Sequence, residues 1–155
     1  MLEGFPDSQS EARWVVATIQ ALLANQTAEE QAALSTADIG IVARTHAQLS
    51  DFEQALNSAG LPLLKLSRSQ ADDRSRAGIR LATMHRIKGL EFRYVFIVGV
   101  NDGVVPLHNA IAHTEDETER RASELNERAL LHVAATRAIR GLWVTWNGRG
   151  SPFLE

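Results

Sequence analysis

Apolar residues recur along the chain with two alternating periods, one typical of helices and one typical of buried strands. Ser8-x-x-Glu11 resembles a helix capping box, and apolar side chains recur at helical spacing after it. A second helical pattern runs from Gln48 to Ser58, and a third occupies much of Glu117–Ile139. The positions expected to face the core are Trp14, Val15, Ile19, Leu22 and Leu23 in the first helix and Phe52, Ala55 and Leu56 in the second.

Short apolar runs of strand length separate these helices. Tyr94–Val100 is apolar nearly throughout, as expected for a central parallel strand covered on both faces. Leu142–Trp146 is expected to close the sheet, with Trp143 and Trp146 packing rather than stacking on bases. The alternation predicts an α/β fold with a mostly parallel sheet flanked by helices. The other predicted strands are Asp38–Arg44, a strand from Leu61 to Leu64, and Ile79–Met84.

Two polar segments interrupt the pattern. Gln26–Thr36 is expected to form a loop or a short extra turn, and Ser67–Gly78, rich in Ser, Asp and Arg, a mobile loop. The acidic run Glu115–Glu119 is expected to be the solvated start of a helix. Residues 1–155 are predicted to form a single domain.

Composition narrows the classes of protein and site. The 155 residues are 45% hydrophobic, which is enough for one core. The absence of cysteine excludes disulfides, thiolate metal sites and a cysteine nucleophile. No apolar run reaches the roughly 20 residues that cross a bilayer, and the first residues do not resemble a secretory signal. We therefore expect a soluble cytoplasmic protein without a membrane partner. His108 and His113 lack paired ligands, so no metal site is expected.

Charge is distributed unevenly. The net charge of −3 argues against wholesale wrapping of nucleic acid, but residues 65–93 form a basic strip. Such a strip fits a local phosphate contact, and it fits equally well a solvated loop with scattered arginines. Its cations are Lys65, Arg68, Arg74, Arg76, Arg80, Arg86, Lys88 and Arg93, against Asp72, Asp73 and Glu91.

An arginine lies on the apolar stripe of the last helical pattern. Leu130, Val133, Ala134 and Arg137 fall on one face at spacings of three and four. Burying an arginine there is costly unless an anionic group meets it. That partner could be a carboxylate, water beyond the helix end or a ligand phosphate, and a cation near a helix C-terminus also gains from the helix dipole.

A dense polar run lies between two predicted strands. The segment TMHRIKGLEF offers donors to phosphates from Thr83, His85 and Lys88, and Glu91 could accept from a sugar hydroxyl. Gly89 permits backbone angles that allow close approach to a ligand. Because ligands of open α/β sheets bind at loops beyond the carboxyl ends of strands, this run is a candidate binding site.

Together with Arg44-Thr45-His46, these segments resemble the motifs of superfamily 1 helicases of the UvrD/Rep/PcrA type. Arg44-Thr45-His46-Ala47-Gln48 is similar to motif IV of that family, the segment 83–92 to motif V, and Glu127–Ala138 to motif VI. They occur in the family's order, within a resemblance running from about Gln9 to Trp146. The resemblance implies the second RecA-like domain of a DNA helicase.

The resemblance also implies roles for single residues towards ATP. Arg44 and Arg137 would approach the γ-phosphate as arginine fingers, Glu91 would contact the ribose, and Gly89 would lie close to the nucleotide. ATP and Mg²⁺ would be held mainly by an N-terminal RecA-like domain of the same parent chain.

On the DNA side, the resemblance implies that Thr83 and His85 grip the backbone of single-stranded or partly duplex DNA. Lys88 and Arg128 are motif members that would orient the others. ATP-driven closing and opening of the two domains would then move the DNA.

Departures from the family pattern limit this expectation. The chain has no G-x-x-x-x-G-K-[ST] loop and no recognisable acidic magnesium motif, so no ATPase activity is expected of it alone. Only Ala47–Ala82 separates motifs IV and V, where larger members carry a further domain. His46 and His132 replace the family's usual Asn and Tyr. The alternative is a helicase-derived module that binds nucleic acid or protein without ATPase function.

Overall fold

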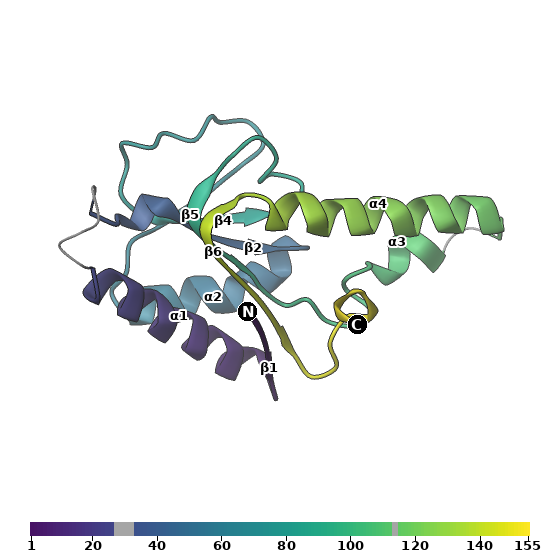
Figure 1. Ribbon diagram of the computed structural model, residues 1–155, viewed down its shortest axis with the longest axis horizontal. Helices are drawn as coiled ribbons and strands as arrows, with labels where there is room; N and C mark the ends of the chain where they lie inside the picture. Colours follow the sequence, from purple (N-terminus) through teal and green to yellow (C-terminus); the bar gives the residue numbers. More distant parts are fainter. Residues whose placement is uncertain (27–32, 113–114) are drawn as a thin grey trace.

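A single parallel sheet organises the molecule. The computed structural model (Figure 1) describes residues 1–26, 33–112 and 115–155. Its six strands are ordered β1-β6-β5-β2-β4-β3 and all pair in parallel, which confirms the predicted α/β class. The strands are β1 (Leu2–Phe5), β2 (Ile39–Ala43), β3 (Leu63–Lys65), β4 (Ile79–Thr83), β5 (Phe92–Ile97) and β6 (Ala138–Asn147).

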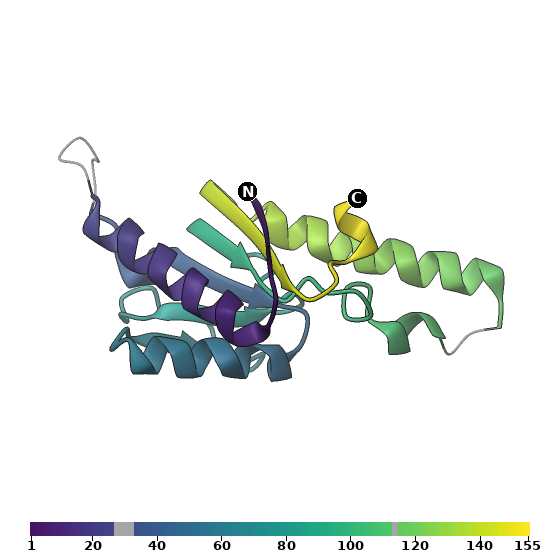
Figure 2. The same ribbon diagram turned by 90° about the horizontal axis from the view of Figure 1, so that it is seen from below.

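Helices cover both faces of this sheet. Helices α1 and α2 pack on one face, and α4 lies across the other and projects beyond the sheet (Figures 1 and 2). Two apolar clusters correspond to these faces, one contributed by α1 and α2 and one by α4. The helices are α1 (Ser8–Ala24), α2 (His46–Ser58), α3 (His108–Ala112) and α4 (Glu117–Ala135), with short 3-10 turns η1 (Thr36–Asp38) and η2 (Pro152–Leu154).

The centre of the sheet matches the sequence pattern, and one edge does not. Val95, Phe96 and Ile97 of β5 are fully buried, as predicted for a central strand. However, β6 does not close the sheet, because β1 pairs outside it. The pattern missed β1 because it has only four residues, alternating between exposed and partly buried. Trp143 stacks on Phe96 with ring centroids 4.6 Å apart, so it packs as predicted.

The first helix begins differently from the prediction. Asp7, not Ser8, is its N-cap, and the Asp7 carboxylate accepts from the Ser10 amide at 2.7 Å. The predicted capping box is therefore wrong. Glu11 is instead fully buried, and its carboxylate accepts from the Gly99 amide at 2.8 Å. Glu11 thus accepts a hydrogen bond from a residue distant in the sequence, whereas the predicted capping box had it bond to the start of its own helix.

The last helix ends earlier than its pattern. α4 ends at Ala135 and Thr136 caps it, its hydroxyl donating to the Val133 carbonyl at 2.8 Å. Ala138 already pairs with Phe92 in the sheet, so the chain has to leave the helix before it. Arg137 therefore lies in the turn between helix and strand. Helical periodicity continued past the end because β6 is also apolar.

The two polar segments contain no α-helix or strand where the structure describes them, and the first ends at Thr36, where the 3-10 turn η1 begins. Residues 27–32, most of the predicted Gln26–Thr36 loop, lie outside the described residues. Ser67–Gly78 contains turns but no helix or strand, and its predicted mobility stays a prediction. Within the described ranges, every helix is too short or too polar to cross a membrane.

Candidate functional site

The candidate residues lie at two opposite edges of the parallel sheet. We call the edge where the strands end the carboxyl edge and the edge where they begin the amino edge. Arg44 follows β2 and Thr83 ends β4, so both lie at the carboxyl edge. Glu91 directly precedes β5 and Arg137 directly precedes β6, so both lie at the amino edge.

Arg44 at the carboxyl edge is held by a carboxylate from α4. Its Nε donates to Glu127 Oε2 at 3.0 Å and its Nη2 donates to Oε1 at 2.8 Å. The side chains of Arg44 and Glu127 are 12% and 5% exposed. The Leu107 amide donates to Glu127 Oε2 at 3.0 Å. Such a bidentate pair fixes the plane of the guanidinium and points it in one direction.

These contacts shift the pKa values of two neighbouring groups. Burial alone would raise the pKa of Glu127, but the hydrogen bonds from Arg44 and the Leu107 amide outweigh it and lower this pKa. Desolvation lowers the pKa of His85, and the positive charges of Arg44 and Arg68 lower it further. At neutral pH this edge therefore presents an ionised Glu127, a charged Arg44 and a neutral imidazole.

The chain after β4 forms a compact turn beside Arg44. The Met84 amide donates to the Ala43 carbonyl at 2.9 Å, which extends the β2–β4 pairing by one bond. The Thr83 carbonyl accepts from the Arg86 and Ile87 amides at 3.0 and 3.2 Å. Thr83 is buried and His85 is exposed. Between this turn and α4 lies a groove of about 410 Å³, lined by Met84, His85, Lys88, Asn126, Glu127, Ala129, Leu130 and Val133.

At the amino edge, a main-chain hydrogen bond links the segments that carry Glu91 and Arg137, the two candidate nucleotide-binding residues. The Phe92 amide, directly after Glu91, donates to the Arg137 carbonyl at 2.9 Å. The Glu91 side chain is exposed. Arg137 Nε donates to the Val133 carbonyl at 3.2 Å and its Nη2 to Thr136 Oγ1 at 3.3 Å. In this state Arg137 thus caps the C-terminus of α4, one of the alternatives that the sequence left open.

Gly89 lies in the connection between the two edges. Its φ is +84°, a conformation that glycine adopts at little cost, and no atom lies within 4 Å of where a Cβ would stand. The backbone at Gly89 is therefore open to a ligand, which is the property that its proposed nucleotide contact requires.

The structure does not bring Arg44 and Arg137 together. Val42 pairs with Ile97 and Ala138 pairs with Phe92, so the two arginines lie at opposite ends of β5. Arg44 is level with Gly99 and Arg137 with Glu91, so at about 3.3 Å per residue their backbones are roughly 25 Å apart along the strands. Two guanidinium groups in these positions do not converge on one phosphate without a rearrangement. The expectation of two arginine fingers on one γ-phosphate therefore lacks support from this geometry.

Lys88 and Arg128, the two supporting motif residues, also lie apart from each other. Lys88 is exposed beside the groove at the carboxyl edge. Arg128 donates to Glu124 at 3.1 Å and lies over the Phe153 ring at 4.1 Å. Arg128 thus faces the C-terminal 3-10 turn, whereas Glu127, its neighbour in the chain, faces Arg44.

Sequence reasoning missed a polar clamp behind the carboxyl edge. Gly99 follows β5 with φ +63°, its amide donates to Glu11, and its carbonyl accepts from Gln48 Nε2 at 2.8 Å. Glu11 also accepts from Thr145 Oγ1 at 2.5 Å. Glu127 was likewise missed as the partner of Arg44. The only local signal was Glu11 on the inward stripe of its helix, where a carboxylate is rarely buried without partners.

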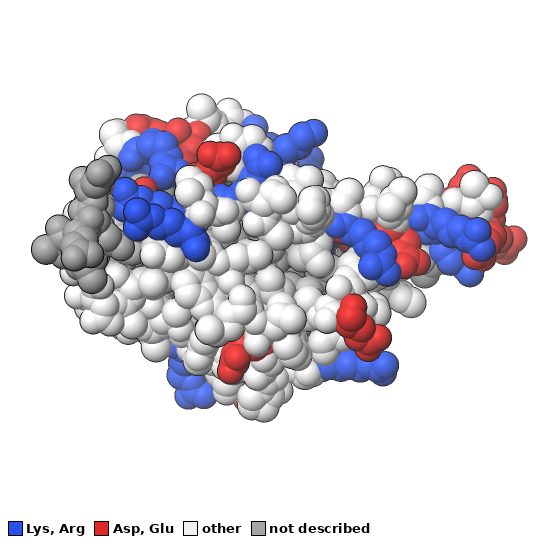
Figure 3. Space-filling view, in the orientation of Figure 1, with Lys and Arg blue, Asp and Glu red and all other residues white. Residues whose placement is uncertain are grey.

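Most cations of the basic strip, residues 65–93, form ion pairs or hydrogen bonds within the chain. Figure 3 shows Lys and Arg side chains, with some acidic ones, at the end of the molecule where β5 and β6 begin, and an uncharged centre. Five of the eight cations between residues 65 and 93 have partners within the chain. Lys65 pairs with Glu53, Arg74 and Arg93 with Asp38, Arg80 with Asp72, and Arg86 with the Ser67 and Gln70 carbonyls.

The chain is similar to helicases over much of its length. Residues 63–149, more than half of the chain, match the family described as the UvrD-like helicase C-terminal domain. The chain is 37% identical over 100 residues to the ATP-dependent DNA helicase UvrD2 of Mycobacterium tuberculosis, covering 59% of this chain and 14% of the relative. It is 43% identical over 68 residues to the ATP-dependent DNA helicase PcrA of Staphylococcus aureus, covering 44% and 9%. The aligned region is thus a small part of these relatives.

A solved structure has the same fold. The crystal structure of the C-terminal domain of a possible DNA helicase from Lactobacillus plantarum WCFS1 superposes with a TM-score of 0.63. The match covers 99% of this chain and 76% of that chain, at 19% sequence identity. At this identity, the likeness supports the fold alone.

Proposed function

Because the chain belongs to the UvrD-like helicase C-terminal domain family, we propose that it is the C-terminal motor half of an ATP-dependent DNA helicase. In this proposal an N-terminal RecA-like domain of the same parent chain holds ATP and Mg²⁺, and this domain closes over them. The observation that carries the proposal is the order of the three motif-like segments around one RecA-like sheet, with their chemistry divided between its two edges.

The amino edge is proposed to act on ATP. Glu91 and Arg137 are held next to one another by the bond from the Phe92 amide to the Arg137 carbonyl. Arg137 bonds only to neutral oxygens of its own helix end in the contacts described above, so a phosphate is a stronger partner for it. On domain closure, Arg137 would stabilise the charge that develops on the γ-phosphate, and Glu91 would accept from the ribose.

The carboxyl edge is proposed to hold single-stranded DNA. Thr83 and His85 supply uncharged donors there, and Lys88 lies beside the same groove. Contacts of this kind position a DNA backbone without reading its sequence. We assign Arg44 to this edge rather than to ATP, because its position beyond β2 is roughly 25 Å from that of Arg137 along the strands. Glu127 then orients Arg44 towards a backbone phosphate.

Helix α4 connects the two edges in this proposal. Glu127 contacts Arg44 at the carboxyl edge, and the same helix ends next to Arg137 at the amino edge. From Glu127 to the helix end at Ala135, α4 rises about 12 Å at 1.5 Å per residue. A shift of α4 on DNA binding would therefore also move Arg137.

The proposal is tested with the protein encoded by the complete reading frame that contains this chain. We expect ATP hydrolysis that single-stranded DNA stimulates, and no hydrolysis by residues 1–155 alone. A complete protein that binds single-stranded DNA but never hydrolyses ATP would instead support the binding-module alternative.

A further inference from the structure

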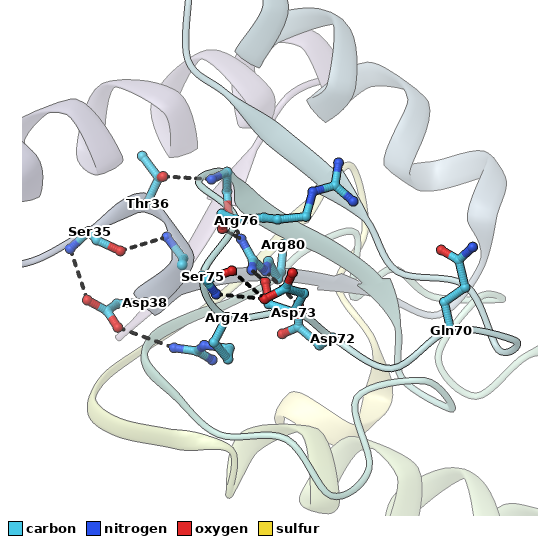
Figure 4. A network of polar contacts seen from close by, with 12 residues as sticks. Ser35, Thr36, Asp38, Gln70, Asp72, Asp73, Arg74, Ser75, Arg76 and Arg80 are labelled. Carbon is cyan, nitrogen blue, oxygen red and sulfur yellow. Dashed lines mark hydrogen bonds and ion pairs between the residues drawn. The ribbon is translucent and has the colours of Figure 1, made fainter.

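A buried arginine anchors the irregular segment between β3 and β4. Arg80 of β4 is 0% exposed, and its guanidinium donates to Asp72 Oδ1 at 3.0 Å and to the Asp73 carbonyl at 2.7 Å (Figure 4). It also donates to the carbonyls of Arg76 and Gly78 at 2.8 and 2.6 Å. A buried charge is tolerated only when it is paired and hydrogen bonded, and Arg80 meets both conditions.

This anchor fixes the segment at the amino edge of the sheet. The acceptors of Arg80 come from residues 72–78, directly before β4 begins. The Gly78 amide donates to Thr36 Oγ1 at 2.8 Å, which ties the segment to η1. Asp73 accepts from the amide and hydroxyl of Ser75 at 3.0 and 2.6 Å. The segment is therefore held in place although it contains no helix or strand.

Arg74, in the middle of this segment, contacts the backbone of Glu91, the candidate ribose-binding residue. Its Nη1 donates to the main-chain carbonyl of Glu91 at 3.0 Å, and its guanidinium lies 5.1 Å from the centroid of the Phe92 ring. Its Nη2 bonds to Asp38 at 3.2 Å. Asp38 is itself held by the Ser35 amide, which donates to Oδ2 at 2.9 Å. Arg74 thus links η1 to the backbone on the C-terminal side of Glu91.

We infer that Arg74 is a positioning residue that orients Glu91 for the ribose of the bound nucleotide, an inference that rests on the proposed role of Glu91. The hydrogen bond to the Glu91 carbonyl and the contact with the Phe92 ring restrict the peptide that joins these residues. Since Glu91 is exposed and lies outside β5, regular sheet pairing alone does not fix its side-chain direction. The irregular segment between β3 and β4 thereby contributes to nucleotide recognition.

The segment also offers a matched control. Arg76 lies two residues after Arg74 and is exposed. In Figure 4 its guanidinium points away from Asp38 and from Arg74. Arg80 uses only the main-chain carbonyl of Arg76, which a substitution keeps. Arg76→Ala therefore removes an equal charge from the same segment without removing the contact to Glu91.

The experiment measures how well the complete protein distinguishes ATP from its 2′-deoxy and 3′-deoxy analogues. The kcat/KM for ATP divided by that for each analogue gives the ribose preference. We expect Arg74→Ala to lower this preference at least threefold through KM, with kcat at saturating ATP within twofold of the wild type. Arg74→Lys keeps the charge but not both contacts, so its preference should fall in between. Arg76→Ala should behave as the wild type.

Glu91→Gln separates this inference from the proposed function. If Glu91→Gln lowers the ribose preference and Arg74→Ala leaves it intact, the positioning role of Arg74 is overturned while the ribose role of Glu91 stands. If the wild type shows no ribose preference, or if Glu91→Gln keeps the preference of the wild type, both assignments are overturned. A parallel loss in the Glu91 and Arg74 variants, without loss in Arg76→Ala, supports the inference.

Discussion

The Arg44 guanidinium donates two hydrogen bonds to the Glu127 carboxylate, at 3.0 and 2.8 Å, across 83 residues of sequence. This pair joins the end of a central strand to the middle of the helix that ends beside Arg137. Arg44 and Arg137, which both resemble members of helicase motifs, lie at different edges of the sheet. Arg44 belongs to the carboxyl edge with Thr83 and His85, and Arg137 belongs to the amino edge with Glu91.

Removing Glu127 should destabilise the domain considerably. Glu127→Ala leaves the largely buried Arg44 without its counter-ion, which costs about 3 kcal/mol of unfolding free energy. The matched control is Glu124→Ala, one turn earlier on α4, where the pair with Arg128 is exposed and is worth less than about 1 kcal/mol. Urea unfolding of this chain measures both. Equal, small effects would contradict the structural importance of the buried pair.

Acidification should destabilise the fold in two windows. The folded pKa of His85 lies below its ordinary value of 6.5, so protonation favours the unfolded state as pH falls below about 6.5. The folded pKa of Glu127 lies below its ordinary value of 4.5, so its contribution is present above that pH and is lost as pH falls through the folded pKa. Melting temperatures between pH 4 and 7.5 should show a first decline that His85→Gln reduces. A melting temperature that is flat down to pH 5 would contradict the shift of His85.

The clamp around Gly99 should tolerate no side chain. In Gly99→Ala, a Cβ would stand 2.3 Å from Gln48 Nε2, at a φ of +63° that side chains rarely adopt. Strain and the lost hydrogen bond together should cost about 2 kcal/mol. Gly103→Ala is the control, because its φ is +80° but nothing lies within 4 Å, so strain alone should cost about 1 kcal/mol. If denaturant unfolding gave equal losses, the bond from Gln48 would contribute nothing to stability.

DNA binding should depend on the carboxyl edge. Thr83→Ala and His85→Ala each remove a donor proposed for a backbone phosphate and should weaken single-strand binding several-fold, about 1 kcal/mol each. His132→Ala, an exposed histidine on α4 in a groove with Arg128 and Phe153, should bind as the wild type. Fluorescence anisotropy with a labelled oligothymidine, in the complete protein, measures the affinity. Unchanged binding in both edge variants would show that DNA lies elsewhere.

Local patterns predicted the regular elements and the motif positions, because both depend on neighbouring residues. The buried strand β5 and the inward stripe of α1 followed directly from periodicity. The short edge strand β1 was not predicted, because it is stabilised by pairing with β6 and no local pattern encodes that pairing. Helix α4 occupies most of the predicted range Glu117–Ile139, and its exact end was not predictable because an apolar strand follows it after a two-residue turn.

The candidate site was predictable residue by residue but not in its arrangement. Motif similarity selected Arg44 and Arg137 equally, and only the strand register shows that they lie at different edges. The partners that hold these edges come from distant sequence. Glu127 is 83 residues from Arg44, and Arg74 is 17 residues from Glu91. Such contacts depend on the topology of the sheet, so spacing along the chain does not reveal them.

The most direct test of this division of roles is the steady-state ATP hydrolysis of the complete protein at saturating single-stranded DNA, with Arg137→Ala and Arg44→Ala compared. If Arg137 acts on the γ-phosphate and Arg44 on DNA, Arg137→Ala should lower kcat by roughly a thousandfold or more with a much smaller change in KM for ATP. Arg44→Ala should instead raise the DNA concentration needed for half-maximal stimulation and leave kcat within about tenfold. Equal losses of kcat in both variants would show that the two arginines act on one phosphate and would contradict the assignment of Arg44 to the DNA edge.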